Sequence, residues 1–274
     1  MQCNGFRQEG DDEGRRASWK RVLGRRAAVA EPPRFGGARN GGSAIQVLLN
    51  APRRIVLHVR QAPPRPQTRR EETANALTHG LGLAASVIAG PLLVAKALHT
   101  GDRVMIAASV AYIVPLIAVF FCSTVSHAVA DAKRKVFWEA WDQATIYLLI
   151  AGAYTPYAAA YLRSDPWPIL TAAMWILAAA GFLTKVVARH RLRRAVIGLY
   201  MALGWLPMVS FPWLLPQLPP VCLALTITGG LCYTFGTIFL CCDRAAPFLH
   251  VLWHLAVLAG AAMHFAAIWG WAIR

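Results

Sequence analysis

Four ionisable residues lie inside or at the edge of long apolar stretches of the sequence: His127, Asp142, His250 and His254. An ionisable side chain at membrane depth costs several kcal/mol unless it has a partner, so such residues are rare and functional by default. Three of the four are histidines, and neutral imidazole is the commonest metal ligand in proteins. These residue types therefore point to a buried metal site.

The spacing of these residues places several of them on shared helical faces. His250 and His254 are four positions apart, which puts both on one face of a helix, about 6 Å apart along its axis. Ser123 and His127 have the same spacing, so the hydroxyl lies one turn from the imidazole. Three neutral imidazoles with an open fourth position are a catalytic zinc arrangement, in which the metal activates water and polarises a carbonyl group. Asp142 would then orient or deprotonate the water, and Ser123 would support the ligands from outside or donate to an oxyanion.

Simpler interpretations of these histidines stay open. An HxxxH pair often arises by chance, and a lone histidine at a membrane edge is more often an interfacial polar group than a ligand. The convergence of four polar positions on one membrane face favours the metal site. His79, with Glu72 and Asn75 on neighbouring turns, fits a polar cluster at a helix end better than the lining of the site. His264 lies roughly 15 Å beyond His254 along a helix, so we expect it to pack or hydrogen-bond elsewhere.

The composition indicates which elements must position these residues. Of the 274 residues, 57% are hydrophobic and the mean hydropathy is +0.43, as in a polytopic membrane protein. About seven apolar runs are each near the roughly 20 residues that a spanning helix requires, which predicts an all-α, seven-transmembrane-helix bundle. Their approximate limits are 76–98, 104–128, 139–161, 167–187, 194–213, 219–241 and 247–272. Prolines predict kinks in four of the runs, at Pro91, Pro115, Pro156 and Pro207.

Basic residues in the connections predict the orientation of this bundle. Lys133, Arg134 and Lys135 follow the second run, a group of arginines follows the fourth, and Arg244 follows the sixth. The alternate connections carry at most one arginine each. The positive-inside rule then places the N-terminus in the cytoplasm and the C-terminus outside. With this topology, all the candidate site residues lie near the cytoplasmic face.

Residues 1–70 differ from the rest of the chain in composition. They are rich in Arg, Gly and Pro, and they hold more than half of the 28 lysines and arginines behind the net charge of +15. We interpret them as a disordered basic cytoplasmic tail, and residues 71–274 as the transmembrane domain.

Other classes of partner find little support in the sequence. No basic patch is interleaved with aromatic residues, which argues against nucleic-acid binding, and no protein partner is evident. The six cysteines form no CxxC pair, so a disulfide framework is not expected.

Four stretches of the sequence resemble a known family. They are residues 71–80 (EETANALTHG), 123–127 (STVSH), 141–156 (WDQATIYLLIAGAYTP) and 250–254 (HVLWH). In this order, and in the expected spans, they resemble the bacterial hemolysin III family. That family is related to the progestin and adipoQ receptors and to the wider alkaline ceramidase-like superfamily.

The resemblance implies a seven-helix bundle with a cytoplasmic N-terminus and a zinc ion (Zn2+) near the cytoplasmic face. His127, His250 and His254 would hold the ion, Asp142 would contact its bound water, and Ser123 would complete the family's signature. A multi-pass location in the bacterial inner membrane is expected, with membrane lipids as partners. The basic tail departs from the usual short bacterial N-terminus, but it leaves the site unchanged.

Two functions fit these observations. The first is a zinc-dependent intramembrane hydrolase of a lipid amide or ester, and the second is a non-enzymatic protein of membrane homeostasis or cytolysis with a structural zinc site. A retinal protein is excluded because the last run contains no lysine for a Schiff base. A transmembrane haem is excluded because His250 and His254 share one helical face and cannot supply axial ligands from opposite sides of the iron.

Overall fold

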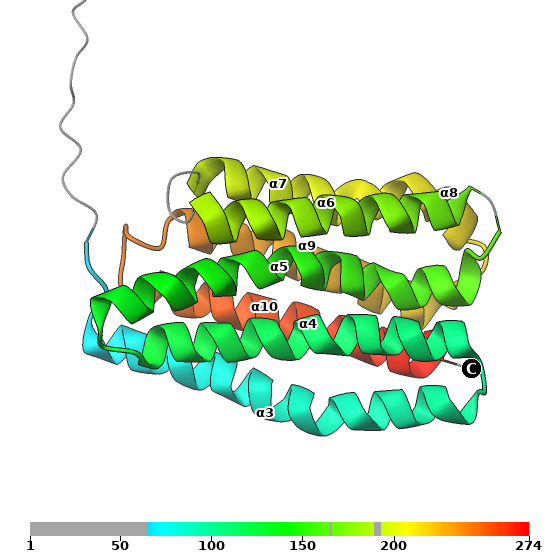
Figure 1. Ribbon diagram of the computed structural model, residues 1–274, viewed down its shortest axis with the longest axis horizontal. Coiled ribbons are helices and arrows are strands. Elements are labelled where there is room, and N and C mark those ends of the chain that lie inside the picture. Colours follow the sequence, from blue (N-terminus) through cyan, green and yellow to red (C-terminus); the bar gives the residue numbers. More distant parts are fainter. Residues whose placement is uncertain (1–64, 165, 189–192, 274) are drawn as a thin grey trace, which may run out of the picture. The chain divides into compact units, whose positions relative to one another are not determined.

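The computed structural model describes residues 65–164, 166–188 and 193–273, and the regular elements in this part of the chain are all helices. They are α3 (Arg69–His99), α4 (Arg103–Ala128), α5 (Ala132–Tyr161), α6 (Trp167–Ala188), α7 (Arg193–Trp205), α8 (Phe211–Leu214), α9 (Pro220–Cys241) and α10 (Leu249–Ala267). A 3-10 turn (Leu206–Ser210) joins α7 to α8, and a π-helical turn (Ile268–Ala272) extends α10. The helices lie side by side in a bundle (Figure 1). Residues 1–64, which make up most of the predicted tail, lie outside the described residues.

The helical segments agree with the seven predicted runs, so the all-α membrane fold is confirmed, while the orientation of the termini stays a prediction. Six helical segments of the described chain are long and apolar enough to cross a membrane. The exception is α5, which packs between α4 and α6 (Figure 1) and buries Tyr147, Tyr154 and Tyr157. Tyr154 donates to Ser210 at 3.2 Å, and the hydroxyls of Tyr157 and Thr226 are 2.9 Å apart. The tyrosines lower the hydropathy of α5, but the hydroxyls of Tyr154 and Tyr157 find partners inside the bundle.

Two helices begin seven residues before the predicted apolar runs because polar side chains cap them. At α3, Thr68 and Glu71 form a capping box: the Thr68 hydroxyl accepts from the Glu71 N–H at 3.3 Å, and the Glu71 carboxylate accepts from the Thr68 N–H at 2.9 Å. At α5, the Asp131 carboxylate accepts from the N–H of Arg134 at 2.9 Å. The added turns extend both helices beyond their apolar parts and carry charged side chains.

The fifth predicted run, 194–213, is not one continuous helix. The turn that contains Pro207 separates α7 from α8. Proline has no backbone N–H and clashes with the preceding turn, so the predicted distortion at this position is confirmed. Pro91, Pro115 and Pro156 lie inside continuous helices, and kinks at these positions stay predictions.

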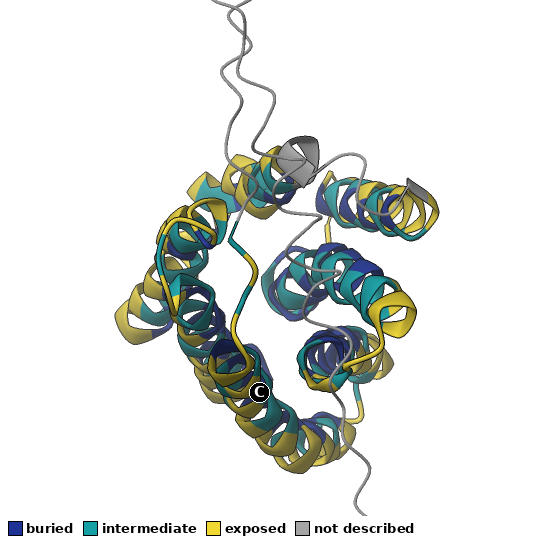
Figure 2. Cartoon of the chain, turned by 90° about the vertical axis from the view of Figure 1, so that its left-hand side faces the viewer, coloured by how far each residue is buried: buried dark blue, intermediate teal, exposed yellow. Residues whose placement is uncertain are grey.

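Apolar side chains cover the outside of the bundle as well as its core. Figure 2 shows exposed residues in yellow on the outward faces of the helices and buried residues in blue between them. Large exposed apolar residues include Leu81 and Ile88 on α3, Ile176 on α6 and Phe235 on α9. Soluble proteins rarely expose an apolar surface of this extent, whereas lipid tails cover such a surface in a membrane.

Close packing brings together the helices that carry the predicted site. A Cβ atom at Gly152 of α5 would lie 2.6 Å from the carbonyl oxygen of Ala111 in α4, so only glycine allows this approach. The helix α3 packs against both α4 and α10. As a result, one end of the bundle combines the start of α3, the end of α4 and the starts of α5 and α10.

Candidate metal centre

Three histidines meet at this end of the bundle. His127 lies in the last turn of α4, and His250 and His254 lie in the first two turns of α10. One candidate ligand atom from each residue lies within 4.8 Å of those of the other two. The ring centroids are 5.1 Å apart for His127 and His250, 4.9 Å for His127 and His254, and 4.7 Å for His250 and His254. We call this group the three-histidine cluster, and it could hold a metal ion.

A carboxylate fixes the orientation of the His127 ring. The Nδ1 atom of His127 lies 2.8 Å from Oε2 of Glu72, in the added first turns of α3. The other carboxylate oxygen of Glu72 lies 2.7 Å from Nζ of Lys135, near the start of α5. A carboxylate can only accept, so Nδ1 of His127 carries the proton and Nε2 keeps its lone pair.

The other two rings are held in the same way. Nδ1 of His250 lies 3.3 Å from Oδ2 of Asp243, a buried residue in the connection before α10. Nδ1 of His254 lies 3.2 Å from the backbone oxygen of Asn75 and 3.3 Å from the Thr78 hydroxyl. All three rings therefore use Nδ1 for outer partners, which leaves Nε2 available for a metal. Metal-binding histidines are oriented by such outer hydrogen bonds.

The start of α10 is also anchored to α3. Phe248 has a left-handed backbone conformation, with φ of 61°, directly before the helix. Its N–H donates to Oε1 of Glu71 at 2.9 Å, and the same carboxylate pairs with Arg65 at 2.6 Å. A non-glycine residue adopts such a conformation only where its surroundings hold it. This contact fixes the backbone at Phe248, two residues before His250 and directly before α10 begins.

Asp142 and Ser123 lie together beside the cluster. Ser123 is fully buried one turn before His127. The carboxyl group of Asp142 is close enough to interact with the Ser123 hydroxyl and with Lys185 of α6. Lys185 is only 2% exposed. Within the described chain, Asp142 is not one of the grouped metal-ligand residues.

His79 differs from its predicted role. Its ring does not join Glu72 and Asn75 in a helix-end polar cluster. Glu72 instead hydrogen-bonds His127, and the backbone oxygen of Asn75 accepts from His254. The His79 ring stacks on the His254 ring, with centroids 3.6 Å apart and planes 12° apart. His79 thus belongs to the surroundings of the cluster.

His264 agrees with its predicted packing role. Its ring is stacked on Tyr233, with centroids 5.7 Å apart and planes 14° apart. A Cβ atom at Gly229 would lie 2.8 Å from the ring, so α9 and α10 approach closely there. His264 takes no part in the three-histidine cluster.

Sequence reasoning missed the outer partners of the cluster. The sequence pattern relates Glu72 only to His79, and Lys135 only to the membrane orientation. It assigns no role to Asp243 or Lys185. An acidic residue in the short connection before HVLWH, and a lysine inside an apolar run, were the available signals.

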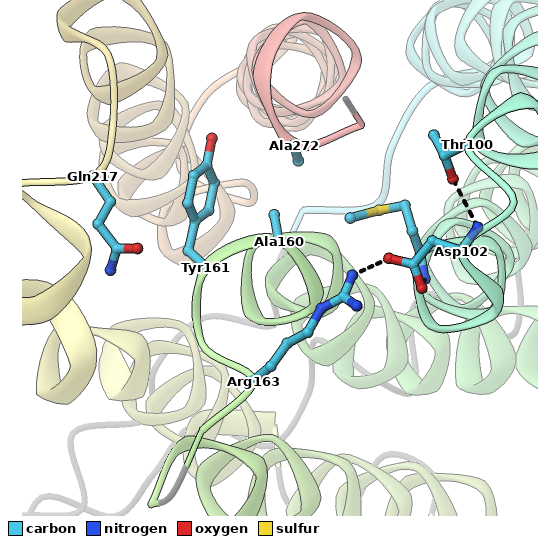
Figure 3. Close-up of a pocket in the computed structure, with 8 residues that line it drawn as sticks. Thr100, Asp102, Ala160, Tyr161, Arg163, Gln217 and Ala272 are labelled. Atoms are coloured by element: carbon cyan, nitrogen blue, oxygen red, sulfur yellow. Dashed lines mark hydrogen bonds and ion pairs between the residues drawn. The ribbon is translucent and has the colours of Figure 1, made fainter.

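A polar pocket lies at the opposite end of the bundle. It has a volume of about 300 Å3, and its lining includes Thr100, Asp102, Tyr161, Arg163 and Gln217 (Figure 3). The side chains of Arg163 and Asp102 point toward one another and form an ion pair. The hydrogen bond from Arg163 lowers the pKa of the Asp102 carboxyl. Among the described residues, the only group suited to hold a metal is the three-histidine cluster, not this pocket.

The fold and the site define a class of protein: a multi-pass helical membrane bundle with three convergent histidines at one end. A family model described as Haemolysin-III related matches residues 67–265, and the chain belongs to this family. The resemblance in the four sequence stretches is thereby confirmed. The family and the apolar helices together make the chain a multi-pass membrane protein and support the expected location in the bacterial cell membrane.

Curated relatives come from bacteria and from mammals. Hemolysin-3 of Bacillus cereus is 35% identical over 196 residues, which cover 72% of this chain and 89% of the relative. The Hemolysin-3 homolog of Bacillus subtilis is 33% identical over 198 residues, covering 72% and 92%. The human monocyte to macrophage differentiation factor is 26% identical over 222 residues, covering 74% and 85%. These alignments span most of each relative.

Proposed function

We propose that this chain is a zinc-dependent intramembrane hydrolase that cleaves an amide or ester of a membrane lipid. The observation that carries the proposal is the convergence of His127, His250 and His254 with Nδ1 of each ring bound to an outer partner. A purely interfacial role would not require three rings with the same free nitrogen at one point. Their position in an apolar bundle makes a lipid the natural substrate class.

The donor set of the cluster fits zinc. Three neutral imidazoles with no thiolate and an open fourth position are typical of catalytic rather than structural zinc sites. When bound, zinc supplies a Lewis acid and lowers the pKa of a water ligand to about 7. Other ions that prefer imidazole fit the same donors, so the identity of the metal is part of the proposal.

The remaining residues act on the substrate and on the proton. Asp142 accepts the proton of the attacking water and returns it to the leaving group, as a general base and then a general acid. Ser123 donates its hydroxyl hydrogen to the carbonyl oxygen as negative charge develops there. Lys185 orients the Asp142 carboxylate from the α6 side. Ser123 and Lys185 are almost completely buried and Asp142 is half-buried, which limits the access of bulk water and strengthens these interactions.

The test is lipid hydrolysis by the purified full chain in detergent. We expect wild type to contain about one zinc per chain and to release fatty acid from at least one member of a panel of lipid amides and esters. A His127/His250/His254 triple alanine variant should contain no zinc and release none. If hydrolysis survives His254→Ala or complete chelation, the mechanism is wrong.

The alternative is a non-enzymatic membrane protein, and the names of the two Bacillus relatives favour a role in cytolysis or membrane homeostasis. In this case the metal would tie α4 to α10 and stabilise the bundle. The alternative gains if His254→Ala abolishes folding while wild type hydrolyses no lipid. It loses if wild type turns over a lipid and the metal-free protein stays folded.

A further inference from the structure

Several buried polar atoms around the three-histidine cluster hydrogen-bond no side chain of the described residues. The side-chain oxygen of Asn75 has no hydrogen-bond partner among the described residues, and neither ring nitrogen of His79 hydrogen-bonds a side chain of the described residues. These two residues are at most 3% exposed, so bulk water does not reach them. Buried polar groups in native proteins are nearly always paired, and exceptions call for a bound partner or a functional explanation.

These groups lie next to the candidate ligands. Asn75 accepts from His254 through its backbone oxygen, and His79, one turn later on the same face of α3, stacks on the His254 ring. Both residues that carry these atoms therefore contact one of the three candidate ligands.

Packing alone does not explain an imidazole at position 79. The ring makes two aromatic contacts, a stack on His254 and an edge contact with Phe120 at 5.2 Å and 82°. Phenylalanine would make both contacts without burying two ring nitrogens that hydrogen-bond no side chain of the described residues. His79 also does not belong to the group of residues that could share one metal ion. What distinguishes histidine here is its ability to donate or accept a hydrogen bond.

We propose that His79 is a substrate-recognition residue, whose ring nitrogen hydrogen-bonds an oxygen atom of the lipid amide or ester bound at the metal centre. The stack on His254 holds the His79 ring beside a candidate ligand, so that the ring edge reaches the polar part of the lipid rather than its hydrocarbon tail. The chemical class of the bound molecule rests on the proposed function. The recognition itself requires binding only, not turnover.

The experiment measures binding of N-hydroxyhexadecanamide, a fatty hydroxamate that resembles a lipid amide and binds zinc through its two oxygens. Zinc content and the Kd for this probe are determined for the zinc-loaded full chain in detergent. His79→Phe keeps an aromatic ring but removes both nitrogens, and His79→Gln keeps a donor and an acceptor but removes the ring. His264→Phe is the matched control, because His264 is also a stacked histidine with a buried, unpaired nitrogen but lies outside the cluster.

We expect His79→Phe to keep its zinc and to bind the probe about tenfold more weakly or worse, because one hydrogen bond to the probe is lost. His79→Gln should bind within a few-fold of wild type, and His264→Phe should be unchanged. A packing role predicts the reverse order, with phenylalanine tolerated and glutamine harmful. If one variant at position 79 does not fold, the other still distinguishes the two orders.

The inference is overturned if His79→Phe binds the probe like wild type, if it loses zinc in parallel with the probe, or if glutamine, with zinc retained, binds as weakly as we expect of phenylalanine. Absence of probe binding by zinc-loaded wild type also overturns it.

The outcomes for recognition and for hydrolysis can be told apart. If wild type and the variants bind the probe with the expected relative affinities but wild type hydrolyses no lipid, the proposed function fails while recognition by His79 stands. If wild type hydrolyses a lipid and His79→Phe has unchanged KM, recognition by His79 fails and the proposed function stands.

Discussion

The two ends of the bundle both bring charged and polar side chains together, but they do so at different depths. At the histidine end, the groups project from within helices, and His254, Asn75 and Ser123 are almost completely buried. At the pocket end, Asp102 and Arg163 lie at the ends of helices, and their side chains are 29% and 49% exposed. Water can satisfy the second pair but not the first group. Burial, rather than the mere presence of charge, therefore distinguishes the end that could hold a metal ion.

The same difference applies to the hydrogen bonds. Asp102 and Arg163 satisfy each other's charge in an ion pair, so no further partner is required there. At the histidine end, the outer partners Glu72 and Asp243 satisfy one nitrogen each and leave the opposite nitrogen unused. Such a one-sided arrangement is expected where a ligand supplies the missing contact. Four experiments test this contrast between the two ends.

The largest effect is expected at the cluster itself. His254→Ala removes one of three ligands, so bound zinc should fall from about one per chain to near zero and lipid hydrolysis should fall to background. Metal analysis and fatty-acid release measure both quantities. His264→Ala, on the same helix, should keep its zinc. Equal zinc loss in both variants would mean that α10 as a whole, not the cluster, had been damaged.

A carboxylate from each end gives the next comparison. Asp142→Asn should keep its zinc and lose about 10²- to 10⁴-fold in hydrolysis, because the amide cannot accept the proton from water. Asp102→Asn removes a carboxylate from the pocket end and should leave hydrolysis unchanged. The measurement is kcat for the best lipid substrate. A general-base role for Asp142 is excluded if the two variants have the same kcat.

The outer partner of His127 should matter less than the ligand. Glu72→Ala removes the acceptor that fixes the His127 ring, and we expect zinc affinity to fall about 10- to 100-fold. Competition with a chelator of known affinity measures the change. Lys135→Ala should have a smaller effect in the same direction, because it removes only the neighbour of Glu72. Unchanged zinc affinity in Glu72→Ala would show that the ring is held by packing instead.

The smallest effect is expected at the exposed ion pair. Arg163→Ala should change the midpoint of thermal unfolding in detergent by about 2 °C or less, because exposed ion pairs contribute little. The pKa of Asp102 is lowered by Arg163, so whatever stability the pair provides is present at neutral pH. It is lost as the pH falls through the lowered pKa of the carboxyl. A large shift of the midpoint at neutral pH would contradict the contrast between the two ends.

Much of the site could be predicted because the information is local. Residues four apart share a helical face whatever surrounds the helix, so the pairs Ser123/His127 and His250/His254 follow from the period of the α-helix. The apolar runs likewise follow from the thickness of the bilayer. The early starts of α3 and α5 were not predicted, because capping by Thr68 depends on a few side-chain hydrogen bonds outside the apolar pattern.

The helical class, the approximate spans and the histidines that share a face all follow from the amino-acid sequence. The folded bundle was needed to show which nitrogen of each ring is free, that Glu72 contacts His127, and that His79 stacks on His254. Helical periodicity sets the direction of a side chain along one helix. Its partner on another helix depends on how the two helices are rotated and how closely they pack, and these depend on the whole bundle at once.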